Sequence, residues 1–266
     1  MLAPNEFVHL HLHSEYSLLD GAVRVTDIPR LAKENGHTAV ALTDHGVMYG
    51  AVAFYRACMA EGIKPIIGCE VYVAPKSRFF KTADRESNYY HLVLLCENEQ
   101  GYKNLIALVS RGYTEGFYGK PRVDDELLAQ YHEGLICTTA CVAGYLAQSI
   151  LKERMDMAEK FLRRLQGIFG DDLYVEIQPY AVTDEGMQER VNVDSIRLAE
   201  RLGIKCILTS DSHRVRPEDL PSYLCDAFCY HRFRYFQCRN HDTGHDRHWL
   251  HVRLWRFIAA YFPGDH

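Results

Sequence analysis

Three histidines alternate with apolar residues near the start of the chain, and metal binding is the chemistry that this spacing suggests. His9, His11 and His13 belong to a run that reads as a strand over Phe7–Leu12. Side chains alternate between the two faces of a strand, so these imidazoles are expected to project to one side. Neutral imidazole is the commonest metal-binding side chain. The alternative is a histidine-rich surface strand, or one core histidine with two exposed neighbours.

Short apolar runs alternate with amphipathic stretches along most of the chain. The expected strands are Phe7–Leu12, Thr38–Thr43, Ile66–Val73, His91–Cys96, Leu135–Thr139, Leu173–Gln178 and Cys206–Thr209. The expected helices are Asp27–Asn35, Met48–Glu61, Glu99–Arg111, Val142–Leu151, Met155–Phe169 and Glu185–Leu202. Strands that alternate with helices predict parallel βα units, and therefore an α/β barrel or an open doubly wound sheet.

Polar residues follow several of these strands where each one ends. The pairs are His11 with His13, Asp44 with His45, and Asp211 with His213. Functional groups drawn from the carboxyl ends of many strands are typical of a barrel, whereas an open sheet concentrates its ligands at one switch point. No glycine-rich phosphate loop follows any strand, which argues against a nucleotide-binding sheet. The pattern favours a barrel.

Nine residues of metal-binding type fall at or near these strand ends. They are His11, His13, Asp20, His45, Glu70, His91, Cys141, Asp211 and His213. Imidazole and carboxylate with one thiolate suit zinc, manganese or iron better than calcium. Nine groups are too many for one tetrahedral ion, so we expect two or three divalent ions, bridged by Glu70 and Asp211. Each residue also has an ordinary alternative: His91 as a core histidine, Cys141 as an inert thiol, Asp20 as a turn residue.

Such a cluster has a specific use on phosphate esters. A bound metal lowers the pKa of its water from ~15.7 to about 7, and two metals about 3.5–4 Å apart stabilise the attacking and leaving oxygens. Phosphate monoester hydrolysis is among the slowest uncatalysed reactions. The sequence therefore predicts hydrolysis by a metal-bound hydroxide, with His11, His13, Glu70 and Asp211 as the catalytic residues that hold the metal.

Several longer segments resemble one known family. They are "FVHLHLHSEYSLLDGA", "AVALTDHGVMYGAVAFY", "GIKPIIGCEVYVAP", "HLVLLCENEQGYKNL", "GFYGKPRVD" and "LTSDSH". From about Phe7 to Pro217 the chain resembles the polymerase and histidinol phosphatase (PHP) domain of bacterial DNA polymerase III alpha subunits. The resemblance implies a distorted seven-stranded (β/α) TIM-like barrel with a multinuclear metal site. It also implies the ligand role for all nine residues, with zinc as the first expectation and manganese or iron as alternatives.

Other residues receive more specific expectations. His9 and Asp44 are expected to orient metal ligands. Lys120 and Arg122 could contact phosphates, and Tyr16 and Tyr49 could stack on a terminal base. Solvated basic residues and ordinary surface tyrosines are the alternatives. These four define the expected substrate-binding residues.

The resemblance implies a function for residues 1–217, the expected PHP phosphoesterase domain. It is metal-dependent 3′ to 5′ exonuclease activity on a DNA terminus, a proofreading step in replication, with DNA and other replicase subunits as partners. The polymerase palm domain of the family is not expected in this chain. The alternatives are a non-catalytic metal-stabilised scaffold and a stand-alone small-molecule phosphatase such as one for histidinol phosphate. The segments "SEYSLLDGA" and "GFYGKPRVD" favour the polymerase branch.

Composition places the chain among soluble cytoplasmic proteins. Its net charge of −5 gives no general basic surface, no signal peptide or membrane-spanning run is evident, and scattered cysteines suit reduced thiols. Residues 218–266 form an arginine-rich, lysine-free tail that departs from the preceding pattern. We interpret this tail as frameshifted or disordered. The alternative is a zinc knuckle that uses Cys225, Cys229, Cys238 and His241.

Overall fold

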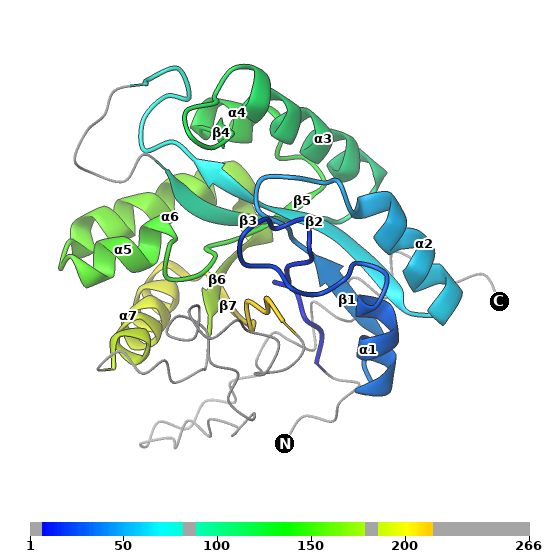
Figure 1. Cartoon of the computed structure of the whole chain (residues 1–266). Helices are drawn as coiled ribbons and strands as arrows, with labels where there is room; N and C mark the ends of the chain where they lie inside the picture. The colour runs from blue at the N-terminus through cyan, green and yellow to red at the C-terminus, as the bar shows by residue number, and fades with distance from the viewer. Residues whose placement is uncertain (1–6, 82–88, 179–185, 215–266) are drawn as a thin grey trace, which may run out of the picture.

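One curled sheet forms the centre of the molecule, with helices on its outside (Figure 1). The computed structural model describes residues 7–81, 89–178 and 186–214. Within these ranges the strands are β1 (Ala39–Leu42), β2 (Lys64–Val73), β3 (Tyr90–Cys96), β4 (Arg122–Val123), β5 (Leu135–Thr138), β6 (Leu173–Ile177) and β7 (Lys205–Leu208). Their order in the sheet is β1-β2-β3-β5-β6-β7, and β4 pairs with β2 at the side. The predicted α/β barrel architecture is confirmed as a distorted, parallel-rich form.

The helices lie mostly where the amphipathic pattern predicts them. They are α1 (Ile28–Glu34), α2 (Ala51–Glu61), α3 (Glu99–Thr114), α4 (Asp125–Gln130), α5 (Tyr145–Leu151), α6 (Met155–Phe169) and α7 (Met187–Leu202). Asn98 and Asp124 cap α3 and α4 with side-chain oxygens that accept backbone N–H groups. Gly62 and Gly203 end α2 and α7 in the left-handed conformation. No helix in the described part of the chain is long and apolar enough to cross a membrane.

Alternation along β3 explains how the two faces of the sheet are buried. Leu92 and Leu94 pack in the larger core with residues of α3, α6 and α7. Val93 and Leu95 point the other way, into a second cluster made almost entirely of strand residues. Because successive side chains of a strand alternate between faces, one apolar run fills both cores. The second cluster fills the inside of the curled sheet.

The segment at residues 7–14 joins the two edges of the sheet, but it is not the continuous strand that the sequence predicts. It makes isolated bridges, His9 to Val40 and Leu12 to Ser212. The backbone N–H groups of Ala41 and His13 donate to the carbonyls of His9 and Ser212, both at 2.8 Å. The segment therefore lies between β1 and the residues after β7 and hydrogen bonds to both, which completes the ring.

The expectation of uniformly parallel βα units is wrong for β3. This strand runs antiparallel to both β2 and β5. A parallel connection needs a crossover, usually a helix, and the described residues between β2 and β3 contain none. The short β4 and α4 were not predicted from sequence. The proposed domain boundary at residue 217, the tail and the alternative zinc knuckle lie outside the described residues.

Candidate metal centre

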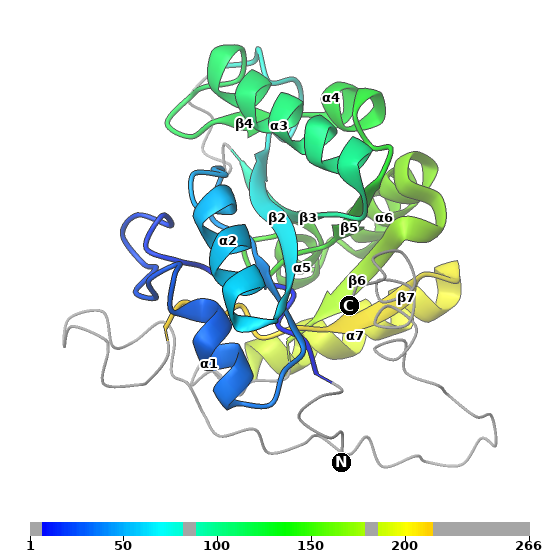
Figure 2. The ribbon, with the colours of Figure 1, turned by 90° about the vertical axis from the view of Figure 1, so that its right-hand side faces the viewer.

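The nine candidate ligands converge at one end of the curled sheet. Asp44 and His45 follow β1, Cys141 follows β5, and Asp211 follows β7. His91 is near the amino end of β3, and it reaches the same place because β3 runs opposite to its neighbours. Figure 2 shows the 14–22 loop, the start of α2 and the residues after β7 on one side of the molecule.

Glu70 lies at the centre of the cluster and is almost completely buried. Its carboxylate oxygens lie 2.6 Å from His45 Nδ1, 2.9 Å from His91 Nδ1 and 3.4 Å from the Nε2 atoms of both His11 and His13. The sulfur of Cys141 is 3.7 Å from Glu70 Oε1. Glu70 therefore contacts five of the other eight candidates.

Asp211 and Asp20 join the remaining residues to this network. Asp211 Oδ1 lies 3.2 Å from Nε2 of His11, 3.3 Å from Nε2 of His13 and 3.2 Å from Nε2 of His213. Asp20 Oδ2 is 3.2 Å from Nε2 of His45, and its Oδ1 is 3.6 Å from Nδ1 of His213. All nine residues therefore form one continuous cluster, with Asp20 at its exposed edge.

Several buried polar atoms inside the cluster are placed where they could coordinate a cation. His11 Nε2, His13 Nε2, His45 Nδ1 and Glu70 Oε2 are buried and make no well-formed hydrogen bond among the described residues. Buried polar atoms without partners cost free energy, and a coordinated ion is one way to satisfy them. Three overlapping groups have ligand atoms within 4.8 Å of one another: His13, His45 and His213; His11, His13 and Glu70; and His45, Glu70 and His91.

The carboxylates set the charge of the histidines. Burial by itself lowers the pKa of His45, but Asp20 and Glu70 raise it to about 10. Burial is likewise outweighed at His213, where Asp20 and Asp211 raise the pKa to about 9. Burial dominates at His13, and with the nearby imidazoles of His213 and His45 it lowers the pKa to about 3. Without a metal, the cluster therefore holds protons on some of its imidazoles.

Glu176 is a residue of the candidate site that the sequence did not single out. It is buried on β6, and its Oε1 accepts from His11 Nδ1 at 2.7 Å and from Gln178 Nε2 at 3.0 Å. The hydroxyls of Thr138 and Thr209 also donate to this carboxylate. Because the carboxylate fixes a proton on His11 Nδ1, the lone pair of the neutral ring lies on Nε2, which faces Glu70 and Asp211. Burial by itself lowers the pKa of His11, but Asp211, Glu176 and Glu70 raise it well above its ordinary value, so a metal at Nε2 must displace a proton. The sequence signal that could have identified Glu176 is a single acidic residue inside an otherwise apolar strand, which is also the setting of Glu70.

Asp44 holds the other strand-end histidine in place through a serine. Its Oδ1 accepts from the Ser14 backbone N–H and from Ser17 Oγ, both at 2.7 Å, and its Oδ2 accepts from Ser14 Oγ at 2.8 Å. The Ser17 hydroxyl, with its proton given to Asp44, lies 2.8 Å from His13 Nδ1 and accepts from it. This arrangement leaves His13 Nε2 directed at Glu70 and Asp211.

Substitution of Asp44 is expected to destabilise the protein even without metal. Asp44→Ala removes one buried carboxylate and leaves three donors without their acceptor, so the free energy of unfolding should fall by about 3 kcal/mol. Urea denaturation in the presence of a chelator measures this change. Asp27→Ala is the control, because Asp27 is exposed and makes no capping hydrogen bond; its effect should stay within about 0.5 kcal/mol. Equal losses in both variants would contradict the role of Asp44.

His9 does not reach the cluster, contrary to the expectation of three histidines on one face. Its Nδ1 lies 2.7 Å from Ser210 Oγ, and its ring contacts Phe7 and His37. Burial, with a further effect of His37, lowers the pKa of His9 to about 3. The irregular backbone of residues 7–14 explains the difference, because alternation holds only in a regular strand. His9 can act on the ligands only through Ser210, the residue before Asp211.

The four expected substrate-binding residues differ in their surroundings. Arg122 is buried, and its guanidinium donates to the backbone carbonyls of Gly116, Arg78 and Phe80. Arg122 therefore holds together the backbone segments around β4. The expectation that it contacts a phosphate is wrong, because its guanidinium is buried and already bonded to these carbonyls. Lys120 is partly exposed, with its Nζ 5.2 Å from the centre of the Tyr72 ring. Tyr16 and Tyr49 lie beside each other at the rim, with ring centroids 6.4 Å apart.

Left-handed backbone accompanies two of the strand-end residues. Asp211 has a φ of 47°, and Ala140, which precedes Cys141, has a φ of 58°. Non-glycine residues in this region carry strain that surrounding structure must support, and such strain gathers at functional sites. Gly21, next to Asp20, has no room for a side chain, since a Cβ would lie 1.9 Å from the Ser14 carbonyl oxygen. The loop that carries Asp20 thus folds tightly against the cluster.

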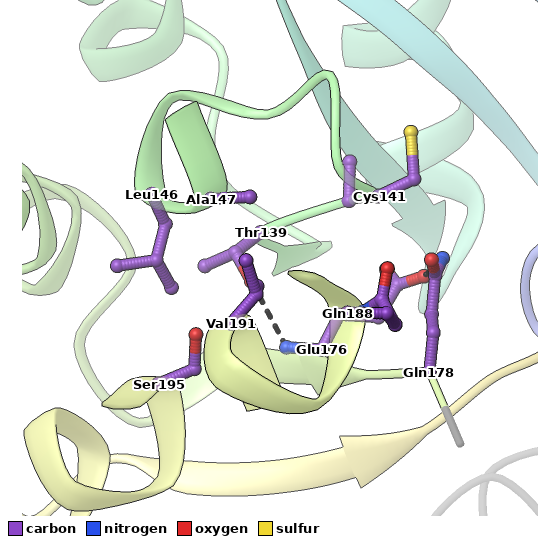
Figure 3. Close-up of a pocket in the computed structure, with 10 residues that line it drawn as sticks. Thr139, Cys141, Leu146, Ala147, Glu176, Gln178, Gln188, Val191 and Ser195 are labelled. Carbon is purple, nitrogen blue, oxygen red and sulfur yellow. Dashed lines mark hydrogen bonds between the residues drawn. The ribbon is translucent and has the colours of Figure 1, made fainter. Parts of the chain in front are cut away.

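A mostly polar pocket adjoins the cluster between α5, α7 and the ends of β5 and β6 (Figure 3). Cys141 and Glu176 line it together with Gln178 and Ser195, and the Cys141 sulfur is turned away from Ser195. The Thr139 hydroxyl accepts from the Glu176 backbone N–H at 3.0 Å. Glu176 therefore forms a wall shared by this pocket and the cluster.

Comparison with known proteins agrees with the geometry. The PHP domain family matches residues 9–180. The chain is 50% identical over 220 residues to the DNA polymerase III subunit alpha of Treponema pallidum, covering 82% of this chain and 18% of that protein. It is 44% identical over 216 residues to that of Borreliella burgdorferi, covering 81% and 19%. The chain therefore spans about a fifth of the length of these relatives.

A solved amidohydrolase from Chromobacterium violaceum has a similar fold. The TM-score is 0.51 at 16% sequence identity, and the match covers 77% of this chain and 87% of that one. At this identity the likeness concerns the fold alone. The match to the family model over residues 9–180 carries the assignment. The chain belongs to the PHP domain family.

Proposed function

We propose that this domain is a metal-dependent phosphoesterase that removes nucleotides from the 3′ end of DNA. The observation that carries the proposal is the single cluster of nine donor residues around Glu70 and Asp211, in which several buried nitrogen and oxygen atoms make no hydrogen bond of good geometry among the described residues. Histidine and carboxylate donors with one thiolate suit zinc first, and manganese or iron next. The overlap of three potential ligand groups supports two or three ions rather than one.

The roles of the residues follow from their contacts. We assign His11, His13, Glu70 and Asp211 to the centre of the cluster. Both imidazoles contact both carboxylates through their Nε2 atoms. We assign Asp20, His45, His91, Cys141 and His213 to the surrounding ligand positions. Divalent ions held there would activate water and offset the charge of a phosphate ester.

The chain's own residues prepare this site for a phosphate. Glu176 and Ser17 hold the protons on the Nδ1 atoms of His11 and His13, so both Nε2 atoms stay available at the centre. Burial of Glu70 and Asp211 keeps their charges unscreened. Burial opposes their ionisation, yet the neighbouring imidazoles hold both carboxyl pKa values well below the usual range. Both residues therefore stay charged across the physiological pH range.

The choice of DNA as substrate rests on the similarity to alpha subunits of DNA polymerase III. Removal of a misincorporated 3′ nucleotide would correct the errors of an adjoining DNA polymerase. Other replicase subunits would then be the partners. The described cysteines are all free thiols, which supports a cytoplasmic location.

Hydrolysis of labelled oligonucleotides tests the proposal. The chain with added zinc or manganese should release mononucleotides from a 3′-labelled single strand, whereas a 5′-labelled strand should shorten progressively. His11→Ala and Asp211→Ala should release none. Bound metal without release from any strand would overturn the catalytic assignment and favour a metal-stabilised scaffold. Release from small phosphate monoesters alone would favour a small-molecule phosphatase.

Metal uptake is expected to release protons. At pH 7.5 the metal-free protein holds protons on His45 and His213, whose pKa values are raised to about 10 and about 9. Ligation requires neutral imidazole, so binding must displace these protons, and affinity should weaken as the pH falls. Titration calorimetry in two buffers of different ionisation enthalpy measures the release. His45→Gln should reduce it by about one proton, and equal heats in both buffers would contradict the expectation.

A further inference from the structure

A row of aromatic side chains extends from the rim of the metal centre. It comprises Tyr16 in the 14–22 loop, Tyr49 before α2, Tyr113 near the end of α3 and Phe117 in the loop that follows, and it is called the aromatic row below. Ring centroids lie 6.4 Å apart for Tyr16 and Tyr49 and 6.3 Å apart for Tyr113 and Phe117. Burial and the neighbouring Tyr49 phenol both raise the pKa of Tyr113, which places the two pairs next to each other. Figure 2 shows these segments on the same side of the molecule.

Three residues of the row are exposed to solvent, and the backbone that carries the row is tightly packed. The exposed fraction is 66% for Tyr49, 49% for Phe117 and 38% for Tyr113. Single exposed aromatics are ordinary, but an adjoining set marks a surface that binds something. The backbone beneath is tightly packed, because a Cβ at Gly50 would lie 2.9 Å from the Tyr16 ring and one at Gly116 only 1.9 Å from the Arg122 carbonyl oxygen. The row is therefore preformed.

A cation connects the row to the metal centre. Lys120 lies in the same loop as Phe117, and its Nζ is 5.2 Å from the centre of the Tyr72 ring. Tyr72 in turn stacks on His45, with ring centroids 6.1 Å apart. The nearby carboxylate of Glu115 is neutralised by Arg78 and Arg111, at 2.7 Å and 3.1 Å. A positive charge thus stands between the aromatic row and the candidate ligands.

We propose that the aromatic row is a binding subsite for single-stranded nucleic acid, with bases on Tyr49, Tyr113 and Phe117 and a backbone phosphate at Lys120. Stacking on aromatic rings beside a basic group is how sequence-tolerant single-strand sites are built. The spacing of 6.3 Å between the rings of Tyr113 and Phe117 exceeds the 3.4 Å rise per nucleotide of one strand in a duplex. Bases on neighbouring rings must therefore be unstacked from each other. The inference rests on the proposed function and extends it, because it names how the strand is held.

Binding can be measured without hydrolysis, which separates this inference from the proposed reaction. Fluorescence anisotropy of a labelled oligothymidylate is recorded with the full chain in a chelator, and again with an abasic strand of equal length. Tyr49→Ala and Phe117→Ala should each weaken binding to the oligothymidylate by at least about fivefold and leave abasic binding nearly unchanged. Lys120→Ala should weaken both and reduce the salt slope by about one. Tyr55→Ala, a half-exposed tyrosine on α2, is the control and should bind like the parent.

Two results would overturn the proposed subsite. If the parent binds the abasic strand as well as the oligothymidylate, or if the row variants bind like Tyr55→Ala, the row is not a base-stacking subsite. If duplex binds more tightly than single strand, the proposed occupant is wrong. The proposed reaction is scored separately, by hydrolysis of bis(4-nitrophenyl) phosphate by the parent with added metal. Loss of base-dependent binding in the row variants supports the subsite even if that ester is not hydrolysed.

Discussion

Replacement of Glu70 by glutamine is expected to remove nearly all phosphoesterase activity and most of the bound metal. Glu70 is the carboxylate that lies closest to the most candidate ligands, four imidazoles and one thiol. Changes to groups that only support metal ligands cost about 10–100-fold, so loss of a central ligand should cost at least about 100-fold. Metal content by mass spectrometry and oligonucleotide hydrolysis measure the two effects.

The matched control is Glu61→Gln at the end of α2. Glu61 pairs with Lys33 at 3.2 Å on the surface, and an exposed pair contributes little. The buried Glu70 carboxylate also pairs with imidazolium groups in the metal-free protein, so its loss could prevent folding. Far-ultraviolet circular dichroism shows whether Glu70→Gln folds. If it does not fold, His91→Gln at the partly exposed edge replaces it and should lower the metal content. Full metal content and activity in a folded Glu70→Gln would contradict the central position of Glu70.

Glu176→Gln is expected to weaken metal binding by about 10–100-fold without removing any proposed ligand. The amide keeps the size of the side chain but loses the negative charge that fixes the proton on His11 Nδ1. The ring of His11 is then no longer held in the one tautomer that presents Nε2 to Glu70 and Asp211. Competition against a chromophoric chelator measures the affinity.

Thr138→Val is the control for Glu176→Gln. It removes one hydroxyl that donates to the same carboxylate and leaves the charge in place. Its effect on metal affinity should be at most a few-fold, because the carboxylate charge opposite His11 remains in place. Equal losses in the two variants would mean that packing, rather than the charge opposite His11, determines the affinity.

The sequence could predict the type and rough position of most of the helices and strands, and it could select the nine candidate ligands. Both depend on local pattern, because apolar periodicity marks the strands and histidines or acids in or beside a strand stand out against it. His91 shows the limit of such reasoning. It was selected as a residue that opens a strand, and only the antiparallel direction of β3 explains why it lies beside Glu70.

Supporting contacts could not be predicted, because they join distant parts of the chain. The partner of His11 is Glu176, 165 residues away, and no local pattern links the two. Arg122 illustrates the opposite error. It was expected either to contact a phosphate or to be solvated, whereas its guanidinium is buried against the carbonyls of neighbouring segments. The contacts of His11 and of Arg122 are both set by tertiary packing between segments that are distant in the sequence.

Anomalous diffraction from crystals grown with zinc or manganese locates bound ions without reference to any activity. A metal centre formed by the nine residues should give two or three strong peaks inside the cluster, with nitrogen and oxygen ligands from His11, His13, Glu70 and Asp211 at about 2.0–2.2 Å. Peaks only at surface histidines such as His132, or no peak among the nine residues, would contradict a metal centre at this end of the sheet.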